Sequence, residues 1–287
     1  MWFRKQLPAF LTSSAGKVNS CLIPDGVKVH AIFLEVGDND GTEVTTGNLI
    51  DDIVVNVFGN PERTTTALKL AQLNALRGSQ YGLHTSGAPG NAAFRTYMPI
   101  WFSTPWVEPR SAGNALGWNL EPGAKLKLDV EVVAAVNAPV LGGWYYYTPL
   151  DGALALIEKW AHTSVQVSGT ANEHSQFDKR DLIQSMHFFP SSSGKYVNLM
   201  KVTRNGQILV EDITHLQNQA ELMGMGLQPD TVAVPRFDLM FDGEDPQDLG
   251  LLANGLNEFT VKTSYNASNS GTMDVTTIRI GKPIGRP

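Results

Sequence analysis

The chain has 287 residues, of which 42% are hydrophobic and only 17% are charged, and its formal net charge is −6 at pH 7. This length suits two ordinary domains, and the acidic balance argues against direct nucleic-acid binding, which needs a basic face. The single cysteine, Cys21, excludes an intramolecular disulfide, and no apolar run reaches the ~18 residues of a membrane-spanning helix. We therefore expect a soluble protein that is made in a reducing compartment and is not exported.

Residues 1–19 are predicted to form an N-terminal arm, in which Trp2 and Phe3 stand beside Arg4 and Lys5. Two interpretations are open. The arm is a loose terminus, or it docks on a neighbouring subunit or on a membrane surface. Aromatic rings insert into such a surface, and Arg or Lys meets the lipid phosphates.

The first β-rich domain is predicted over residues 20–138. Its clearest strand is 125–133, where Leu and Val alternate with Lys, Asp and Glu. A period of two marks a strand with one buried and one polar face. A helix is predicted over 65–77, because a threonine can cap its start and Gly78 follows its end. We expect Leu68 to lie on its buried face.

Residues 139–180 are predicted to connect the two domains, and residues 181–287 are predicted to form a second β-rich domain. The Asn-Gly pair at 205–206 indicates a tight hairpin turn. A helix is predicted over 213–223 with Asp212 as its N-cap. Its spacing indicates a buried face made of Ile213, Leu216, Ala220 and Met223.

The two domains repeat one another faintly. Residues 53–78 and 197–224 each read as a β-rich run, a turn with glycine, and an amphipathic helix that ends at glycine. Phe94 and Phe237 then open a further strand in each domain. These positions lie 143–147 residues apart, too far for a solenoid repeat. The pattern predicts a duplicated domain, although unrelated β domains that reuse the same turn chemistry would also produce it.

Many short strands, one helix in each half and no alternating βαβ pattern predict a mainly β protein. A sandwich of eight antiparallel strands built from two Greek keys is a jelly roll. We therefore predict two tandem eight-stranded antiparallel jelly rolls, each with a short helix.

No nucleotide-binding loop, zinc-protease motif or serine-hydrolase elbow occurs in the sequence. The six histidines have no ligand spacing. His30 and His187 lie inside predicted strands, where a packed, hydrogen-bonded histidine is the simpler interpretation. The sequence therefore predicts neither an enzyme nor a cofactor, with calcium as the one ion to consider.

Two acidic loops are weak calcium candidates. Asp38 and Asp40 begin like a calcium loop but lack the later bidentate glutamate, and Asp242, Glu244 and Asp245 form a second cluster. The alternative is that these residues only make turns, as Asp, Asn, Gly and Pro often do.

The long connection 98–118 is unusually aromatic. Such rings either cover their own domain or form an interface, where Trp is enriched. The low charge of the chain favours the interface, whose predicted residues are Trp101, Phe102, Trp106 and Trp118.

Four segments carry a resemblance to a known family. They are 10–26, with Ala15-Gly16, Asn19-Ser20-Cys21 and Pro24; 183–188 (IQSMHF); 197–224; and 237–243 (FDLMFDG). Together they resemble the double-jelly-roll major capsid proteins of membrane-containing icosahedral bacteriophages. The likeness is greatest to the corticovirus-type coat protein, with the tectivirus coat protein and adenovirus hexon as more distant members. The segments 98–118 and 144–147 depart from the family pattern.

The resemblance implies a homotrimer in which three chains, each with two similar rolls, form a pseudo-hexameric capsomer. Such capsomers tile an icosahedral shell over an internal membrane, and the N-terminal arm lies near that membrane. The implied partners are further copies of the chain, the internal membrane or its proteins, and minor capsid and vertex proteins. The implied location is the virion capsid, after synthesis in the host cytoplasm.

Two other functions compete with this one. A carbohydrate- or receptor-binding β-sandwich, such as a phage spike or a lectin-like protein, would use the aromatic loops to stack on sugars. A two-domain glycoside hydrolase would need two carboxylates that face each other across a cleft.

Overall fold

The structure is a computed structural model of the chain, and it contains two compact units. Unit 1 comprises Met1–Glu158 and Lys282–Pro287, and unit 2 comprises Lys159–Gly281. The division falls within the predicted connection 139–180, most of which is strand rather than linker. The structure describes residues 1–38, 49–88, 90–91, 93–107, 113–136, 138–177, 181–190, 195–230, 235–241, 251–252 and 258–285.

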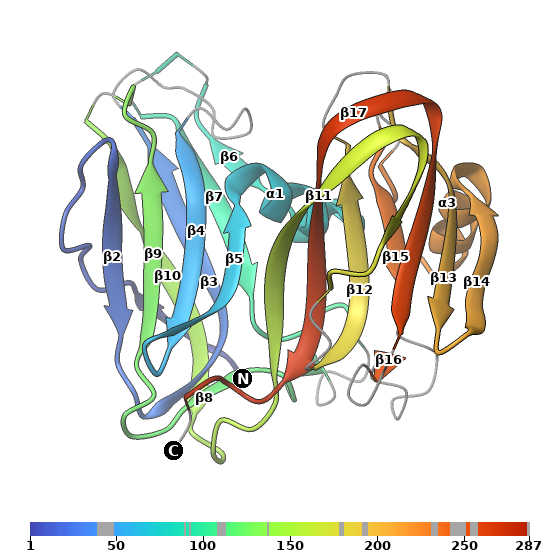
Figure 1. Cartoon of the computed structure of the whole chain (residues 1–287). Helices are drawn as coiled ribbons and strands as arrows, with labels where there is room; N and C mark the ends of the chain where they lie inside the picture. The colour runs from blue at the N-terminus through green and yellow to red at the C-terminus, as the bar shows by residue number, and fades with distance from the viewer. Residues whose placement is uncertain are drawn as a thin grey trace. The chain divides into compact units, whose positions relative to one another are not determined.

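In the described residues, unit 1 comprises two antiparallel sheets and the helix α1 (Figure 1). One sheet has the strand order β1-β10-β3-β7-β6 with β8 beside β3, and the other has the order β5-β4-β9-β2. The bounds are β1 Phe3–Gln6, β2 Lys17–Ile23, β3 Val27–Gly37, β4 Ile50–Val57, β5 Asn60–Thr66, α1 Ala67–Leu76, the 3-10 helix η2 Ser79–Tyr81, β6 His84–Ser86, β7 Arg95–Trp101, β8 Trp118–Leu120, β9 Leu126–Val132 and β10 Val140–Pro149.

Unit 2 repeats this plan. One sheet has the order β14-β13-β17-β11, and in the other β12 pairs with β15, β16 and the second half of β17. The bounds are β11 Ile157–His174, which begins in unit 1, β12 Leu182–Phe189, β13 Val197–Arg204, β14 Gln207–Thr214, α3 His215–Gly224, β15 Phe237–Met240, β16 Leu251–Leu252 and β17 Phe259–Gly281. In the described residues, no helix is both long and apolar enough to cross a membrane.

The strand β9 forms as the sequence predicts. Its leucine and valine side chains, Leu126, Leu128, Val130 and Val132, are buried in the core of unit 1. The residues between them are half-buried. Burial on one face and solvent on the other explains why a period of two was readable in this segment.

The two units have the same strand order, which confirms the predicted tandem jelly rolls. β5-β4-β9-β2 in unit 1 corresponds to β14-β13-β17-β11 in unit 2, and the helix follows the hairpin in both. Both hairpins turn through two residues with positive φ. These are Phe58 (51°) and Gly59 (79°) in unit 1, and Asn205 (46°) and Gly206 (76°) in unit 2. This is the turn whose twist matches that of paired strands.

The hairpin of unit 2 contains one more residue than that of unit 1. Thr66 follows Gly59 by seven positions, whereas Thr214 follows Gly206 by eight. The extra residue is a β-bulge in β14, where the pairing with β13 shifts and Asp212 has a φ of 46°. A bulge inserts one residue on one strand only.

The predicted N-cap Asp212 is therefore wrong. The cap of α3 is Thr214, whose hydroxyl accepts a hydrogen bond from the backbone N–H of Gln217, while the Gln217 side chain accepts one from the backbone N–H of Thr214. This reciprocal pair is a capping box. The equivalent Thr66 caps α1 and accepts from the backbone N–H of Lys69.

The predicted buried faces of both helices are also wrong. Leu216 and Met223 of α3 and Leu68 of α1 are exposed. The buried side chains of α1 include Leu70 and Leu73, and those of α3 are His215, Asn218 and Leu222. A buried asparagine anchors each helix. Asn74 donates to the carbonyl of Pro99 in β7 at 2.7 Å, and Asn218 donates to that of Asp238 in β15 at 2.9 Å.

Candidate functional site

The N-terminal residues form strand β1 at the edge of a sheet in unit 1, which corrects the interpretation of the arm as a loose terminus and leaves its docking role a prediction. Phe3 pairs with Tyr147 and Arg4 with Tyr146 in β10. The side chains of β1 are exposed to solvent. No local pattern indicated this strand, because an edge strand with one neighbour has no buried face to impose a period of two.

Partly buried aromatic rings lie in contact across this sheet, from β10 through β3 to β7. The ring of Trp144 stacks on Phe33 with centroids 5.4 Å apart, and the Arg4 guanidinium lies 4.1 Å from the centroid of the same indole. Phe33 in turn meets Trp101 edge-on at 5.5 Å. Each such pair contributes about 0.5–1.5 kcal/mol beyond burial. We call this group of rings the aromatic face.

A pocket of about 640 Å³ lies beside the aromatic face, with Trp2, Tyr81, Pro105 and Asn114 among its lining residues. Trp2 stacks on His30 with centroids 4.8 Å apart, so one face of its indole is already covered. The volume is sufficient for a small ligand, since ligand pockets span ~300–1,000 Å³. Its described lining carries no charged side chain.

His30 is a packed, hydrogen-bonded histidine, as the sequence predicts. It sits in a β-bulge of β3, next to the shift in pairing with β10. Its ring nitrogens lie 2.6 Å from the Ser103 hydroxyl and 3.0 Å from the Thr148 hydroxyl. Burial, helped by the charge of Lys28, lowers the pKa of His30 to about 4. The imidazole is therefore neutral at pH 7.

The four predicted interface aromatics differ in burial, because two are fully buried and two are half-buried. Phe102 and Trp118 are fully buried and pack on each other, with ring centroids 4.7 Å apart. They belong to the core of unit 1 and present no surface to a partner, which corrects the interface interpretation for these two. Trp101 and Trp106 are half-buried and both contact Tyr81, at 5.8 and 5.3 Å.

The calcium candidates find no support in the part of the chain that is described. Asp38 is buried at the end of β3. Asp40, Asp242, Glu244 and Asp245 lie outside the described residues. Within those that are described, no group of three or more His, Cys, Asp or Glu is placed to hold a metal ion.

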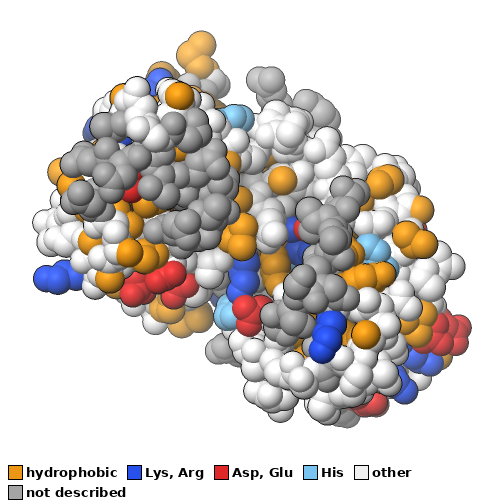
Figure 2. Space-filling model, turned by 90° about the horizontal axis from the view of Figure 1, so that it is seen from above, with side chains coloured by type: hydrophobic (Ala, Val, Ile, Leu, Met, Phe, Trp, Pro, Cys, Tyr) orange, Lys and Arg blue, Asp and Glu red, His pale blue; other side chains and the backbone are white. Residues whose placement is uncertain are grey.

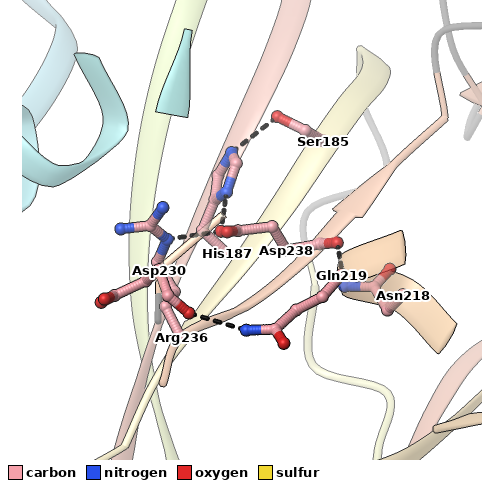
Figure 3. Close-up of polar contacts among 7 residues, drawn as sticks. All are labelled: Ser185, His187, Asn218, Gln219, Asp230, Arg236 and Asp238. Atoms are coloured by element: carbon pink, nitrogen blue, oxygen red, sulfur yellow. Dashed lines mark hydrogen bonds and ion pairs between the residues drawn. The ribbon is translucent and has the colours of Figure 1, made fainter. Parts of the chain in front are cut away.

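Unit 2 contains a buried polar network that motif searching missed (Figure 3). The Ser185 hydroxyl lies 2.8 Å from Nε2 of His187, and Nδ1 of His187 lies 2.6 Å from the Asp238 carboxylate. Nε of Arg236 donates to the same oxygen of Asp238. Ser185 and His187 come from β12, and Asp238 comes from the adjacent β15.

Electrostatics keep the carboxylate of this network ionised. Burial alone would raise the pKa of Asp238, but the Arg236 guanidinium and the His187 hydrogen bond outweigh it and lower the pKa to about 2. A buried charge is tolerated when it is paired and hydrogen-bonded in this way.

The connectivity of Ser185, His187 and Asp238 is that of a nucleophile, a base and an orienting carboxylate. All three side chains are nevertheless at most 1% exposed. A nucleophile must reach a substrate, and Ser185 points into the interior of unit 2. The arrangement can therefore hold β12 to β15, but it cannot attack an external substrate in this conformation.

The chain matches no protein-family model and no curated protein. Among solved structures, it is similar to the major capsid protein P2 from bacteriophage PM2, with a TM-score of 0.80 and 14% identity over 98% of both chains. It is also similar to the PBCV-1 virus capsid (TM-score 0.65, 11% identity, 98% of this chain and 93% of that one). The Faustovirus major capsid protein gives 0.66 and 8%, over 98% and 90%.

At such low identity the likeness concerns the fold. Both units of the chain take part in it, since the matches cover nearly the whole chain. The chain therefore has the double-jelly-roll fold of viral major capsid proteins, as the resemblance in the sequence implied.

Proposed function

We propose that the chain is a major capsid protein that forms homotrimeric, pseudo-hexameric capsomers of an icosahedral viral shell. The observation that carries this proposal is the pairing of two jelly rolls with one strand order in a single chain, an arrangement shared with P2 over 98% of both chains. Three such chains supply six similar rolls around one axis. A capsomer of that outline can tile a closed shell, so the place of the protein is the virion capsid.

The surface agrees with a protein that is covered in an assembly. Only 17% of the residues are charged, against about 25% in ordinary soluble domains. In the view of Figure 2, charged side chains form small separate groups among hydrophobic and uncharged surface. A structural role also fits the burial of the Ser185–His187–Asp238 network, so no enzymatic activity is proposed.

The mass of the native protein tests this function. We expect light scattering coupled to gel filtration to give the mass of three 31.2 kDa chains. A monomer at micromolar concentration would contradict the capsomer. The monomer would favour the carbohydrate-binding alternative if it were also retained on a glycan column.

The pocket beside the aromatic face supports the carbohydrate-binding alternative, but the packing of the aromatic rings opposes it. A sugar-binding platform needs a free ring face. The Phe33 ring stacks on the Trp144 indole and the Arg4 guanidinium lies over the same indole, while His30 stacks on one side of Trp2. The rings mostly pack on one another.

The internal membrane is the second part of the proposal. Arg4 and Lys5 are exposed on β1, and each basic residue near anionic lipid contributes about 1 kcal/mol. Many trimers in one shell would multiply this weak attraction. Minor capsid and vertex proteins would complete the shell.

Flotation with anionic liposomes tests the membrane contact. The double variant Arg4→Glu/Lys5→Glu should remain trimeric but lose most of the liposome binding of the wild type. The double variant Lys125→Glu/Lys262→Glu, which changes two exposed lysines elsewhere, is the control and should float like the wild type. Equal binding by all three proteins would disprove a membrane role for β1.

A further inference from the structure

Because the strand order is duplicated, β5 and β14 are equivalent strands. Among the described residues of each unit, β5 is covered on the side that faces away from β4, whereas β14 has no neighbour on the side that faces away from β13. Nε of Arg63 in β5 donates to the carbonyl of Glu158 at 2.9 Å, and its guanidinium pairs with the Glu158 carboxylate at 3.2 Å. Arg63 is only 2% exposed. Glu158 belongs to the first two residues of β11, which lie in unit 1. The beginning of β11 thus covers the outer side of β5.

The equivalent side of β14 is open in unit 2. In the described chain, β14 pairs only with β13. Val210 takes the place of Arg63, because each is the fourth residue after the turn glycine. The neighbouring Ile208 is 43% exposed, and Leu216 at the start of α3 is 76% exposed. We call this surface, made by β14 and the exposed side of α3, the β14 edge.

A matching surface lies at the opposite end of the equivalent sheet in unit 1. The order β5-β4-β9-β2 makes β2 the counterpart of β11. The counterpart of the beginning of β11 is therefore the segment that leads into β2. Leu11 in this segment is 76% exposed, and Val18 and Leu22 of β2 are also exposed. We call residues 11–23 the β2 edge.

We propose that the β14 edge of one copy of this chain packs against the β2 edge of a second copy. The proposal rests on the proposed capsomer and assigns its subunit contact. Within one chain, the beginning of β11 covers β5. Since β14 corresponds to β5 and β2 corresponds to β11, the segment that leads into β2 of a second copy can cover β14 in the same way. Different surfaces meet in such a heterologous contact, and it forms a ring when the rotation closes.

The chemistry of the two edges is complementary. Each edge exposes large apolar side chains, and their removal from water would stabilise the contact. Glu211 and Asp212 of β14 are exposed, and so is Lys17 of β2. Acidic groups on one edge can therefore meet a basic group on the other, which favours association of unlike edges over like ones.

Two single variants test the contact. Ile208→Lys changes the β14 edge, and Leu11→Lys changes the β2 edge. Both side chains are exposed, so the circular dichroism spectrum and melting temperature of each monomer should resemble those of a folded jelly roll. We expect each variant alone to have the mass of one 31.2 kDa chain. Ile284→Lys, a substitution of an isoleucine that is also 43% exposed, is the matched control and should remain trimeric.

Mixing the two variants tests the heterologous geometry by native mass spectrometry. Ile208→Lys retains a normal β2 edge and Leu11→Lys retains a normal β14 edge, so the mixture should give a 1:1 complex. A trimeric wild type whose single variants stay trimeric, or whose variant mixture stays monomeric, would overturn this contact and leave the capsomer in place. A monomeric wild type would overturn both proposals.

Discussion

Replacement of Arg236 by methionine should lower the free energy of unfolding by about 3–5 kcal/mol, because it leaves a buried carboxylate without its cation. The Arg236 side chain is 3% exposed and pairs with Asp238, which is not exposed at all. Urea unfolding followed by circular dichroism measures the effect. Arg204→Met in β13, at a half-buried arginine, is the control and should change stability by less than about 0.5 kcal/mol.

A second substitution separates the charge from the packing. In Arg236→Met/Asp238→Asn the unpaired charge is gone, so part of the lost stability should return. If the double variant is no more stable than the single one, the loss comes from the packing of Arg236 on Phe189, whose ring lies 5.7 Å from the guanidinium carbon.

The effect should also depend on pH. In the wild type the pKa of Asp238 is lowered to about 2, so the stability it contributes is present above the unfolded pKa of about 3.9 and is lost as pH falls toward 2. In Arg236→Met, burial acts without the guanidinium and raises the pKa of Asp238, so protonation at low pH relieves the unpaired charge. The difference between wild type and variant should therefore be smaller at pH 4 than at pH 7.

The sequence indicated only part of the Ser185–His187–Asp238 network. His187 within a predicted strand indicated a hydrogen-bonded histidine, and Asp238 between apolar residues in FDLM was an available sign of a buried pair. Neither residue identified its partner, because the register of β12 against β15 joins positions 51 apart in the chain. Pairing over such a distance leaves no local pattern.

Local chemistry predicted some elements well. The two-residue turn at Asn205-Gly206 and the alternation of β9 follow from preferences of the residues themselves. The order of strands, turn and helix in each half was sufficient to predict two jelly rolls. In contrast, the buried faces of α1 and α3 depend on which strands they pack against, and the apolar residues of each helix lie on more than one side.

The candidate site was the least predictable part. Trp2 and Arg4 were predicted to be available for docking, but the sequence could not indicate that β10 would pair with β1 and place Trp144 beneath Arg4. Similarly, the aromatic composition of the connection 98–118 does not indicate which of its rings pack into the core. Trp118 fills the core, whereas Trp106 stays at the surface.

The difference in burial between Trp118 and Trp106 leads to the second large effect that we expect. Trp118→Ala should lower the free energy of unfolding by about 3–5 kcal/mol, since it empties a fully buried site between the ring of Phe102 and the guanidinium of Arg63, which lie 4.7 and 5.2 Å away. Trp106→Ala is the matched control. Its half-buried ring contacts Tyr81 and Arg77, so its loss should cost about 1–2 kcal/mol, clearly less than the loss of Trp118.

Thermal unfolding and gel filtration of the two tryptophan variants together separate a core role from an interface role. A core residue lowers the melting temperature and leaves the association of the remaining folded protein intact. An interface residue does the reverse. We expect the first behaviour from Trp118→Ala, because its indole has no exposed surface with which to contact a second chain. An unchanged melting temperature combined with loss of the trimer would instead place Trp118 in the subunit contact.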